Sequence, residues 1–294
     1  MQVRLIVSPY DSGQKLKRMG RGPDRLLGEG LAAALAADGH SVELRRIDLG
    51  EAFPSEIAVG FAAMRAVAEE VRVARDAGAL PVVLGGNCNT TVGAVAGLGC
   101  AEAGVLWLDA HGDINTPDTS QSGFLDGMGV AILTGRAWSA LAHSIPGFAA
   151  LPDERVVLAG IRDLDSEEAT LLADSAIAVV EAANIGEAGA AAALETALAA
   201  LAGRIGSLHL HLDLDVHDAG VAPANHFRPP GGLAPDQVGA VIDAALARLP
   251  LGSMAVTAYD PAVDPAGVTA AAAIDHVRRA VRARAQGGGL RDSA

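Results

Sequence analysis

Three clusters of polar residues able to do chemistry each follow a short apolar run typical of a β-strand. The clusters are Asp109, His111 and Asp113, then Asp213 and Asp215, and the earlier group Asn87, Cys88 and Asn89. In a parallel α/β sheet, ligands bind beyond the carboxyl ends of the strands. We therefore expect the three clusters to meet at one site.

The spacing of the carboxylates predicts a metal centre. In extended backbone, residues i, i+2 and i+4 share a side, which groups Asp109 with His111 and Asp113, and Asp213 with Asp215. Four carboxylates in one cleft repel one another unless cations are bound. Two divalent ions would neutralise them, and mixed carboxylate and imidazole ligation suits Mn²⁺. Either motif alone could be a polar loop or a capping turn, but together they favour a metal site.

Strand-like and helix-like runs alternate along the chain. The eight candidate strands are 3–7, 41–47, 81–84, 105–108, 156–158, 177–180, 208–214 and 254–258. The candidate helices are 23–37, 57–77, 167–173, 188–201, 235–247 and 266–284. This alternation predicts a mostly parallel sheet covered on both faces. With no linker or internal repeat, we expect one domain over 1–285 and a disordered tail at 286–294.

Composition narrows the function classes. The net charge is -13, from 22 Lys+Arg against 35 Asp+Glu, which argues against nucleic-acid and anionic-membrane partners. Two cysteines are too few for a secreted disulfide framework. No secretory signal pattern and no apolar run of about 18 residues occurs, so we expect a soluble, cytoplasmic protein. Among the other histidines, His276 is expected at the surface and His209 as a hydrogen-bonded core residue.

The polar clusters resemble a known family. The segment 109–117, Asp-Ala-His-Gly-Asp-Ile-Asn-Thr-Pro, looks like the signature of arginases, agmatinases and formimidoylglutamases. His211-Leu212-Asp213-Leu214-Asp215 matches the second metal motif of these ureohydrolases. The segment 85–88, Gly-Gly-Asn-Cys, stands where they have Gly-Gly-Asp-His. The resemblance runs from about Gly85 to Pro261 in matching order.

The resemblance implies an arginase-like three-layer α/β/α fold and two Mn²⁺ ions, with one ion as the alternative. A hydroxide bridging the ions would attack an amidine carbon. The implied metal ligands are Asp109, Asp113 and Asp213 in shared positions, His111 and Asp215 on the second metal, and Cys88 in place of a histidine on the first. The family also implies a small amino-acid-like substrate and includes trimers, hexamers and monomers.

The resemblance extends to substrate recognition. Asn115 and Ser122 match residues that hold an α-carboxylate, and the acids that match those contacting the α-amino group are Asp163, Asp165 and Glu168. The acidic run could instead be the N-cap of a helix, where the helix dipole favours negative charge. The two roles are compatible.

Four positions depart from the arginase pattern. Cys88 replaces a histidine, Asn87 an aspartate, and Asp126 a proton-shuttling histidine. Ala258 stands where a glutamate clamps the guanidinium, and Asp260 could substitute if it faces the same way from a strand. We therefore expect little plain arginase activity.

With these departures, the chain is similar to the Nω-hydroxy-L-arginine hydrolases. We expect hydrolysis of a C–N bond in a guanidine- or amidine-bearing amino acid, with Asp126 and His111 as the catalytic residues and Asp126 protonating the leaving amine. Two alternatives remain. One is a degenerate member that binds an amino acid or metal without turnover, and the other is an enzyme using Cys88 as a nucleophile.

Overall fold

The computed structural model describes residues 1–50, 55–185 and 188–288. Its centre is an eight-stranded sheet in which every paired strand is parallel, in the order β4-β1-β5-β10-β9-β6-β7-β8. The strands are β1 (Gln2–Ser8), β4 (Ser41–Arg46), β5 (Leu80–Gly85), β6 (Ala103–Leu108), β7 (Val156–Ile161), β8 (Ala178–Glu181), β9 (Ser207–Asp213) and β10 (Leu251–Thr257). A small antiparallel hairpin follows β1, made of β2 (Tyr10–Asp11) and β3 (Gln14–Lys15). All eight predicted strands are confirmed.

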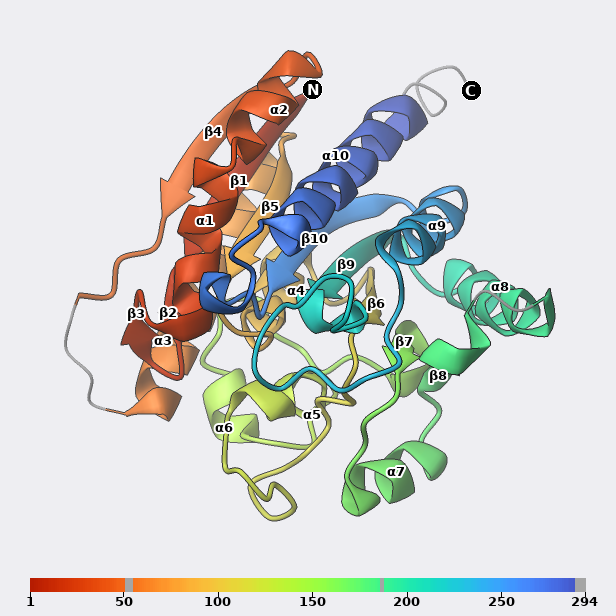
Figure 1. Ribbon diagram of the computed structural model, residues 1–294. Helices are drawn as coiled ribbons and strands as arrows, with labels where there is room; N and C mark the ends of the chain where they lie inside the picture. The colour runs from red at the N-terminus through yellow and green to blue at the C-terminus, as the bar shows by residue number, and fades with distance from the viewer. Residues whose placement is uncertain (51–54, 186–187, 289–294) are drawn as a thin grey trace.

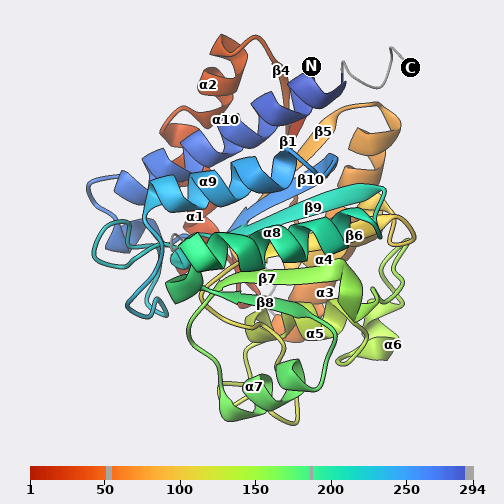
Figure 2. The same ribbon diagram turned by 90° about the vertical axis from the view of Figure 1, so that its right-hand side faces the viewer.

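Helices cover both faces of the sheet, giving the expected α/β/α layers (Figures 1 and 2). One layer holds α1 (Gly22–Gly28), α2 (Leu31–Ala37), α8 (Ala188–Ala202), α9 (Pro235–Leu246) and α10 (Val268–Gly288). The opposite layer holds α3 (Glu56–Asp76), α4 (Thr90–Leu98), α5 (Gly129–Leu133), α6 (Ser139–Ala142) and α7 (Ser166–Ala173). Short 3-10 turns are η1 (Arg18–Arg21), η2 (Asp126–Met128), η3 (Asp153–Arg155), η4 (Ala182–Asn184), η5 (Leu214–Val216) and η6 (Pro261–Val263).

The strand order places the polar clusters together. Strands β5, β10, β9 and β6 are consecutive neighbours, and their interiors are buried on both faces, as expected for parallel strands between helix layers. Because these strands are parallel, their carboxyl ends lie at one edge of the sheet. The polar segments after Leu84, Leu108 and Leu212 therefore emerge side by side.

Three boundaries differ from expectation. The predicted helix 23–37 is two helices, because Gly30 adopts φ 93 and ends the first. The predicted last helix continues to Gly288, so 286–288 of the expected tail are helical, whereas 289–294 lie outside the described residues. The predicted strand 254–258 stops at Thr257, and Ala258 adopts φ 60.

No helix in the described ranges is both long and apolar enough to cross a bilayer.

Candidate metal centre

The polar clusters meet in one pocket at the carboxyl ends of the central strands. Acidic side chains dominate its lining: Asp11, Asp113, Asp126, Asp163, Asp165, Glu168, Asp213 and Asp215. The other polar members include Ser12, Arg18, Asn87, Cys88, His111, Asn115, Ser122 and Asn225. Asp109 is fully buried beside them. The chain thus gathers an unusual density of carboxylates in one cavity.

The segment after β6 folds back on Asp109. The Asp109 carboxylate accepts hydrogen bonds from Trp107 Nε1 at 2.9 Å and from the His111 amide at 2.8 Å. His111 Nδ1 lies 3.3 Å from Asp109 Oδ1 and 3.5 Å from Asp215 Oδ2. The backbone is not extended through Asp113, which adopts φ 49, so the expected i, i+2, i+4 geometry was wrong there. Asp113 nevertheless lines the same pocket.

The second motif turns sharply at the end of β9. Asp213 is the last residue of the strand, and its carboxylate accepts from the Asp215 amide at 2.7 Å. The Asp215 carboxylate accepts from Asn225 Nδ2 at 3.0 Å and from the Ala110 amide at 3.3 Å. These bonds fix the 213–215 turn against the segment after β6.

Arg162, at the end of β7, braces this turn. Its guanidinium donates to backbone carbonyls of Gly160, Asp215, Val216, His217, Pro229 and Pro230, at 2.7 to 3.3 Å. Gly160 allows the close approach, because a Cβ there would lie 2.5 Å from Val216 Cγ2. One partly buried cation therefore holds β7, the 215–217 turn and the 229–230 loop together.

Cys88 faces the second motif from the loop after β5. Its Sγ donates to Asp213 Oδ2 at 2.8 Å and lies 3.3 Å from Thr257 Oγ1. Burial, followed by the charge of Asp213, raises the pKa of the Cys88 thiol well above its usual value. Gly86 lets this loop pass the first hairpin, since a Cβ would lie 2.2 Å from the Tyr10 carbonyl oxygen.

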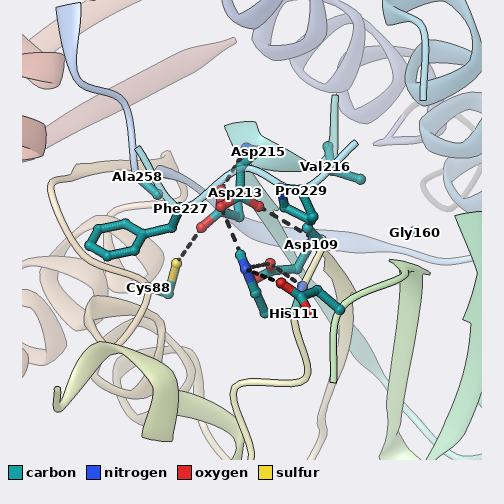
Figure 3. Close-up of polar contacts among 12 residues, drawn as sticks. Cys88, Asp109, His111, Gly160, Asp213, Asp215, Val216, Phe227, Pro229 and Ala258 are labelled. Atoms are coloured by element: carbon teal, nitrogen blue, oxygen red, sulfur yellow. Dashed lines mark hydrogen bonds and ion pairs between the residues drawn. The ribbon is translucent and has the colours of Figure 1, made fainter. Parts of the chain in front are cut away.

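Two overlapping sets of side chains could each hold a cation. The Cys88 group comprises Cys88, Asp109, His211 and Asp213, and the His111 group comprises Asp109, His111 and Asp215. Within each group the potential ligand atoms lie within 4.8 Å of one another. Figure 3 shows Cys88, Asp213, Asp109 and His111 pointing into one space. Asp113 belongs to neither group.

Unpartnered polar atoms show that this donor set fits metal ions. His211 Nε2 and Asp113 Oδ2 are buried and have no hydrogen-bond partner among the described residues. The His211 ring is fixed by Thr91 Oγ1, 2.7 Å from its Nδ1, and stacks on Trp107 at 3.7 Å. Burial lowers the pKa of His211 well below its usual value, which favours the neutral ring. Nε2 can then offer its lone pair to a metal ion.

The electrostatics of the cluster also call for positive charge. Burial, then repulsion by Asp215, raises the pKa of both Asp109 and Asp213. Burial would lower the pKa of His111, but Asp215 and Asp109 raise it well above its usual value. Burial would likewise raise the pKa of Asp215, but His111 keeps it low. Divalent cations would supply the charge that a protonated His111 only partly provides.

Asp126 lies beside the Cys88 loop, in the pocket lining. Its carboxylate accepts from Asn87 Nδ2 at 2.7 Å and from the Cys88 and Asn89 amides at 2.5 and 3.3 Å. Burial, then the charge of Asp11, raises the pKa of Asp126 to about 7. Asn87 thus links the loop to Asp126.

The residues expected to recognise an amino acid come from the segments after β6 and β7 and form one wall of the pocket. Asn115 Nδ2 donates to Asp165 Oδ2 at 3.0 Å, and Glu168 accepts from the Ile114 amide at 3.1 Å. Asp165 and Glu168 also form the capping box of α7, so the helix-cap alternative and pocket lining coexist. Asp163 lies 3.8 Å from His111 Nε2.

Ser122 completes this wall at its exposed edge, and its hydroxyl accepts from the Phe124 amide at 3.2 Å. Each residue expected to bind the α-carboxylate or the α-amino group therefore lies in the pocket lining.

Asp260 does not take the place of the missing glutamate. Its carboxylate caps η6 through the Ala262 amide and lies 3.2 Å from Arg21 Nη2, and it is absent from the pocket lining described above. The expectation failed because β10 ends at Thr257 and the left-handed Ala258 redirects the chain. Ala258 itself lines the pocket.

Sequence reasoning did not assign three residues that the structure places here. His211 alternates with Asp213 on β9, so strand periodicity could have found it. Asn225 comes from an irregular loop and Arg18 begins η1, and no spacing pattern in the sequence connects them to the strand ends.

The sequence is similar to those of known arginases. The model of the arginase family matches residues 1–282. The arginase of Brucella melitensis is 30% identical, covering 94% of both chains. The arginase of Eremothecium gossypii is 32% identical over 78% of this chain and 62% of its own length, so the match spans less than two thirds of that relative.

Solved structures agree with the sequence relatives. The arginase of Bacillus caldovelox superposes with a TM-score of 0.87 at 28% identity, covering 95% of this chain and 97% of its own. The arginase of Bacillus cereus gives 0.86 at 27% identity, covering 95% and 98%. With its parallel sheet, its two ligand groups and these matches, the chain belongs to the arginase family.

Proposed function

We propose that this protein is a metal-dependent hydrolase that cleaves a C–N bond of an amino acid bearing a guanidine or amidine, with Nω-hydroxy-L-arginine as the preferred type of substrate. Two manganese ions and a cytoplasmic location are parts of the same proposal. The observation that carries it is the convergence of the Cys88 and His111 groups in a pocket that also contains Asp163, Asp165 and Glu168.

The two ligand groups would hold the cations through Asp109, His111, His211, Asp213, Asp215 and Cys88, with Asp113 close by. When bound, divalent cations lower the pKa of water and polarise the bond to be cleaved. Asp126 lines the pocket beside Cys88, so its carboxyl can deliver a proton to the departing amine. His111 Nε2 is turned toward Asp163, where it can orient the substrate.

The wall that holds Asp163, Asp165 and Glu168 accounts for an amino-acid substrate. Carboxylates of Asp163, Asp165 and Glu168 suit an α-ammonium group, and the amide of Asn115 with the hydroxyl of Ser122 suits an α-carboxylate. These groups line the same cavity as most members of the two ligand groups.

Ala258 supports the choice of a weakly basic substrate. A methyl side chain offers no carboxylate to a charged guanidinium, and Asp260 does not replace it. A charge-assisted hydrogen bond is worth roughly 1.5–3 kcal/mol, so its loss lowers arginine turnover about 10- to 100-fold. An N-hydroxyguanidine is less basic and depends less on that contact.

The test is ornithine release from Nω-hydroxy-L-arginine and from L-arginine at saturating Mn²⁺. We expect faster release from the hydroxylated compound. Ala258→Glu should raise arginine turnover by roughly 10- to 100-fold. Ala262→Glu adds the same charge at an exposed position outside the pocket lining and should leave the ratio unchanged. A clear preference of the wild type for arginine would contradict the proposal.

A second candidate is a protein that binds an amino acid or a metal without turnover. Cys88 favours it, because burial and Asp213 keep the thiol protonated unless a cation displaces the proton. This candidate predicts saturable binding of L-ornithine with no hydrolysis of either substrate at any Mn²⁺ concentration.

A further inference from the structure

Two buried histidines form a pair next to the second metal motif. His217 is the residue after η5, the turn that carries Asp215, and His276 lies on α10, 59 residues further along the chain. His217 is fully buried and His276 is 1% exposed. Within the described ranges the pocket lining includes neither ring, so the proposed chemistry uses neither of them.

The two rings meet head to head. His217 Nε2 and His276 Nε2 are 3.1 Å apart, and the ring planes differ by only 9°. The ring centroids are 5.3 Å apart, which exceeds the nitrogen separation by about the width of one ring, so the rings meet edge to edge in nearly one plane. Because the N–H and the lone pair of an imidazole point outward in the ring plane, the two Nε2 atoms share a hydrogen bond.

The neighbours decide which ring donates. His217 Nδ1 lies 2.9 Å from the Leu214 carbonyl oxygen, which can only accept, so Nδ1 carries a proton. Burial lowers the pKa of both rings, in His276 to about 3, which favours a neutral ring with a single N–H in each. His217 Nε2 is therefore a lone pair, and His276 Nε2 donates to it. The remaining lone pair, on His276 Nδ1, has no hydrogen-bond partner among the residues that the structure describes.

The His217 side chain closes the turn that carries Asp215. The His217 amide reaches the Leu214 carbonyl oxygen at only 3.4 Å, whereas the ring nitrogen Nδ1 donates to it at 2.9 Å. Arg162 binds the carbonyls of Asp215, Val216 and His217, so the Leu214 carbonyl is the one in 214–217 that this arginine leaves to another partner. The ring of His217 supplies that partner, next to the Asp215 carboxylate.

The backbone of His217 is fixed as well. It forms a β-bridge with Leu233, in which the Leu233 amide donates to the Val216 carbonyl at 3.0 Å and the Asp218 amide to the Leu233 carbonyl at 2.9 Å. Gly232 permits this pairing, because a Cβ there would lie 2.5 Å from the His217 carbonyl oxygen. With its backbone held and its ring buried, His217 depends on His276 to satisfy the nitrogen that faces away from the turn.

We propose that His276 is a positioning residue for the cation of the His111 group, acting through His217 on the turn that holds Asp215. Its N–H pairs the lone pair of His217 Nε2, and a chain of hydrogen bonds strengthens the bond from Nδ1 to the Leu214 carbonyl. With an apolar residue at 276, His217 Nε2 becomes a buried acceptor without a partner. Rotation of the ring or entry of water relieves that state, and either change releases the Leu214 carbonyl. The inference needs only metal binding through Asp215 and is independent of the substrate and of the proposed hydrolysis.

The test measures the two Mn²⁺ dissociation constants by competition with a coloured chelator. His276→Leu should lower the affinity for one cation by about 10-fold, the lower end of the range for residues that orient a metal ligand, and leave the other unchanged. The affected cation should be the one that Cys88→Ser retains. His276→Gln should keep the wild-type affinity, because its amide nitrogen can donate to His217. Val277→Ala disturbs the same helix at a buried apolar position and should leave both constants unchanged.

Nuclear magnetic resonance of histidine-labelled wild type, loaded with diamagnetic Zn²⁺ in place of Mn²⁺, tests the pairing without any substitution. Two-bond ¹H–¹⁵N correlations should place the proton of His217 on Nδ1 and that of His276 on Nε2. The opposite proton positions would overturn the inference, even if His276→Leu is too unstable to purify. So would unchanged affinity in His276→Leu, equal losses in His276→Leu and His276→Gln, or an equal loss in Val277→Ala. A protein that hydrolyses no guanidine would leave each of these outcomes as decisive as before.

Discussion

The Cys88 group and the His111 group share Asp109 but differ in depth and in donor type. All four members of the Cys88 group are buried, and they include a thiol and a neutral imidazole. The His111 group opens to the pocket through His111, whose side chain is 26% exposed. The first group must lose a thiol proton to reach its full donor strength, whereas the second already has carboxylates on both sides of an imidazole.

The two ligand groups are therefore not chemically equivalent. Thiolate is a softer ligand than imidazole or carboxylate and selects other metals. We therefore expect the two groups to differ in affinity and metal preference, and the following variants test that difference.

Asp109→Asn should have the largest effect, because Asp109 belongs to both groups. We expect loss of both cations and of activity. This effect should exceed the roughly 10- to 100-fold loss of metal affinity that follows when a metal ligand loses its hydrogen-bond partner. Mn²⁺ should raise the melting temperature of the wild type by mass action but not that of the variant. Elemental analysis and thermal melts check this.

Burial raises the pKa of Asp109, which means that a neutral side chain is favoured at this position. The metal-free protein should therefore tolerate asparagine there. Asp118→Asn, at an exposed position, is the matched control. Retention of two cations by Asp109→Asn would show that the groups are not joined through this residue.

Substitutions of Cys88 should affect metal binding by the Cys88 group only. Cys88→Ser should remove one cation equivalent and leave the His111 group loaded, because a hydroxyl is a weaker donor than a thiolate. Cys88→His should keep or raise occupancy. Metal content after gel filtration measures both. A covalent adduct on Cys88, trapped with substrate and seen by mass spectrometry, would instead identify it as a nucleophile.

The smallest effects are expected from residues that orient the ligands. Thr91 bonds His211 in the Cys88 group, and Asn225 bonds Asp215 in the His111 group. Thr91→Val and Asn225→Ala should each lower the affinity for one of the two cations by about 10- to 100-fold. Competition with a coloured chelator resolves the two dissociation constants. If both variants lower the affinity for the same cation, the division into two groups is wrong.

Sequence periodicity was sufficient for the sheet and for most members of the two groups of side chains that could hold a cation. Buried parallel strands are short apolar runs, and the residue after each run lies at the binding edge, which located Asp109 and Asp213. Helix α4 was missed because its sequence, Thr-Thr-Val-Gly-Ala-Val-Ala-Gly-Leu, is rich in residues with low helix propensity. It forms because all nine residues are buried against α3 and the sheet.

Local backbone and long-range contacts account for the remaining errors. Left-handed conformations at Asp113 and Ala258 cannot be read from strand spacing. His276 was expected at the surface, but it is buried and lies 3.1 Å from His217 Nε2, a pairing between residues 59 positions apart. His209 is confirmed as a core residue, with Ser253 Oγ 2.7 Å from its Nδ1.

The brace formed by Arg162 has a consequence for folding. Its guanidinium bonds to carbonyls 53 to 68 residues further along the chain, so these contacts cannot form until the 215–217 turn and the 229–230 loop have docked against the end of β7. The ligand groups should therefore be completed late in folding. During unfolding, amide exchange of the 215–217 turn should report the loss of the brace before the central strands exchange.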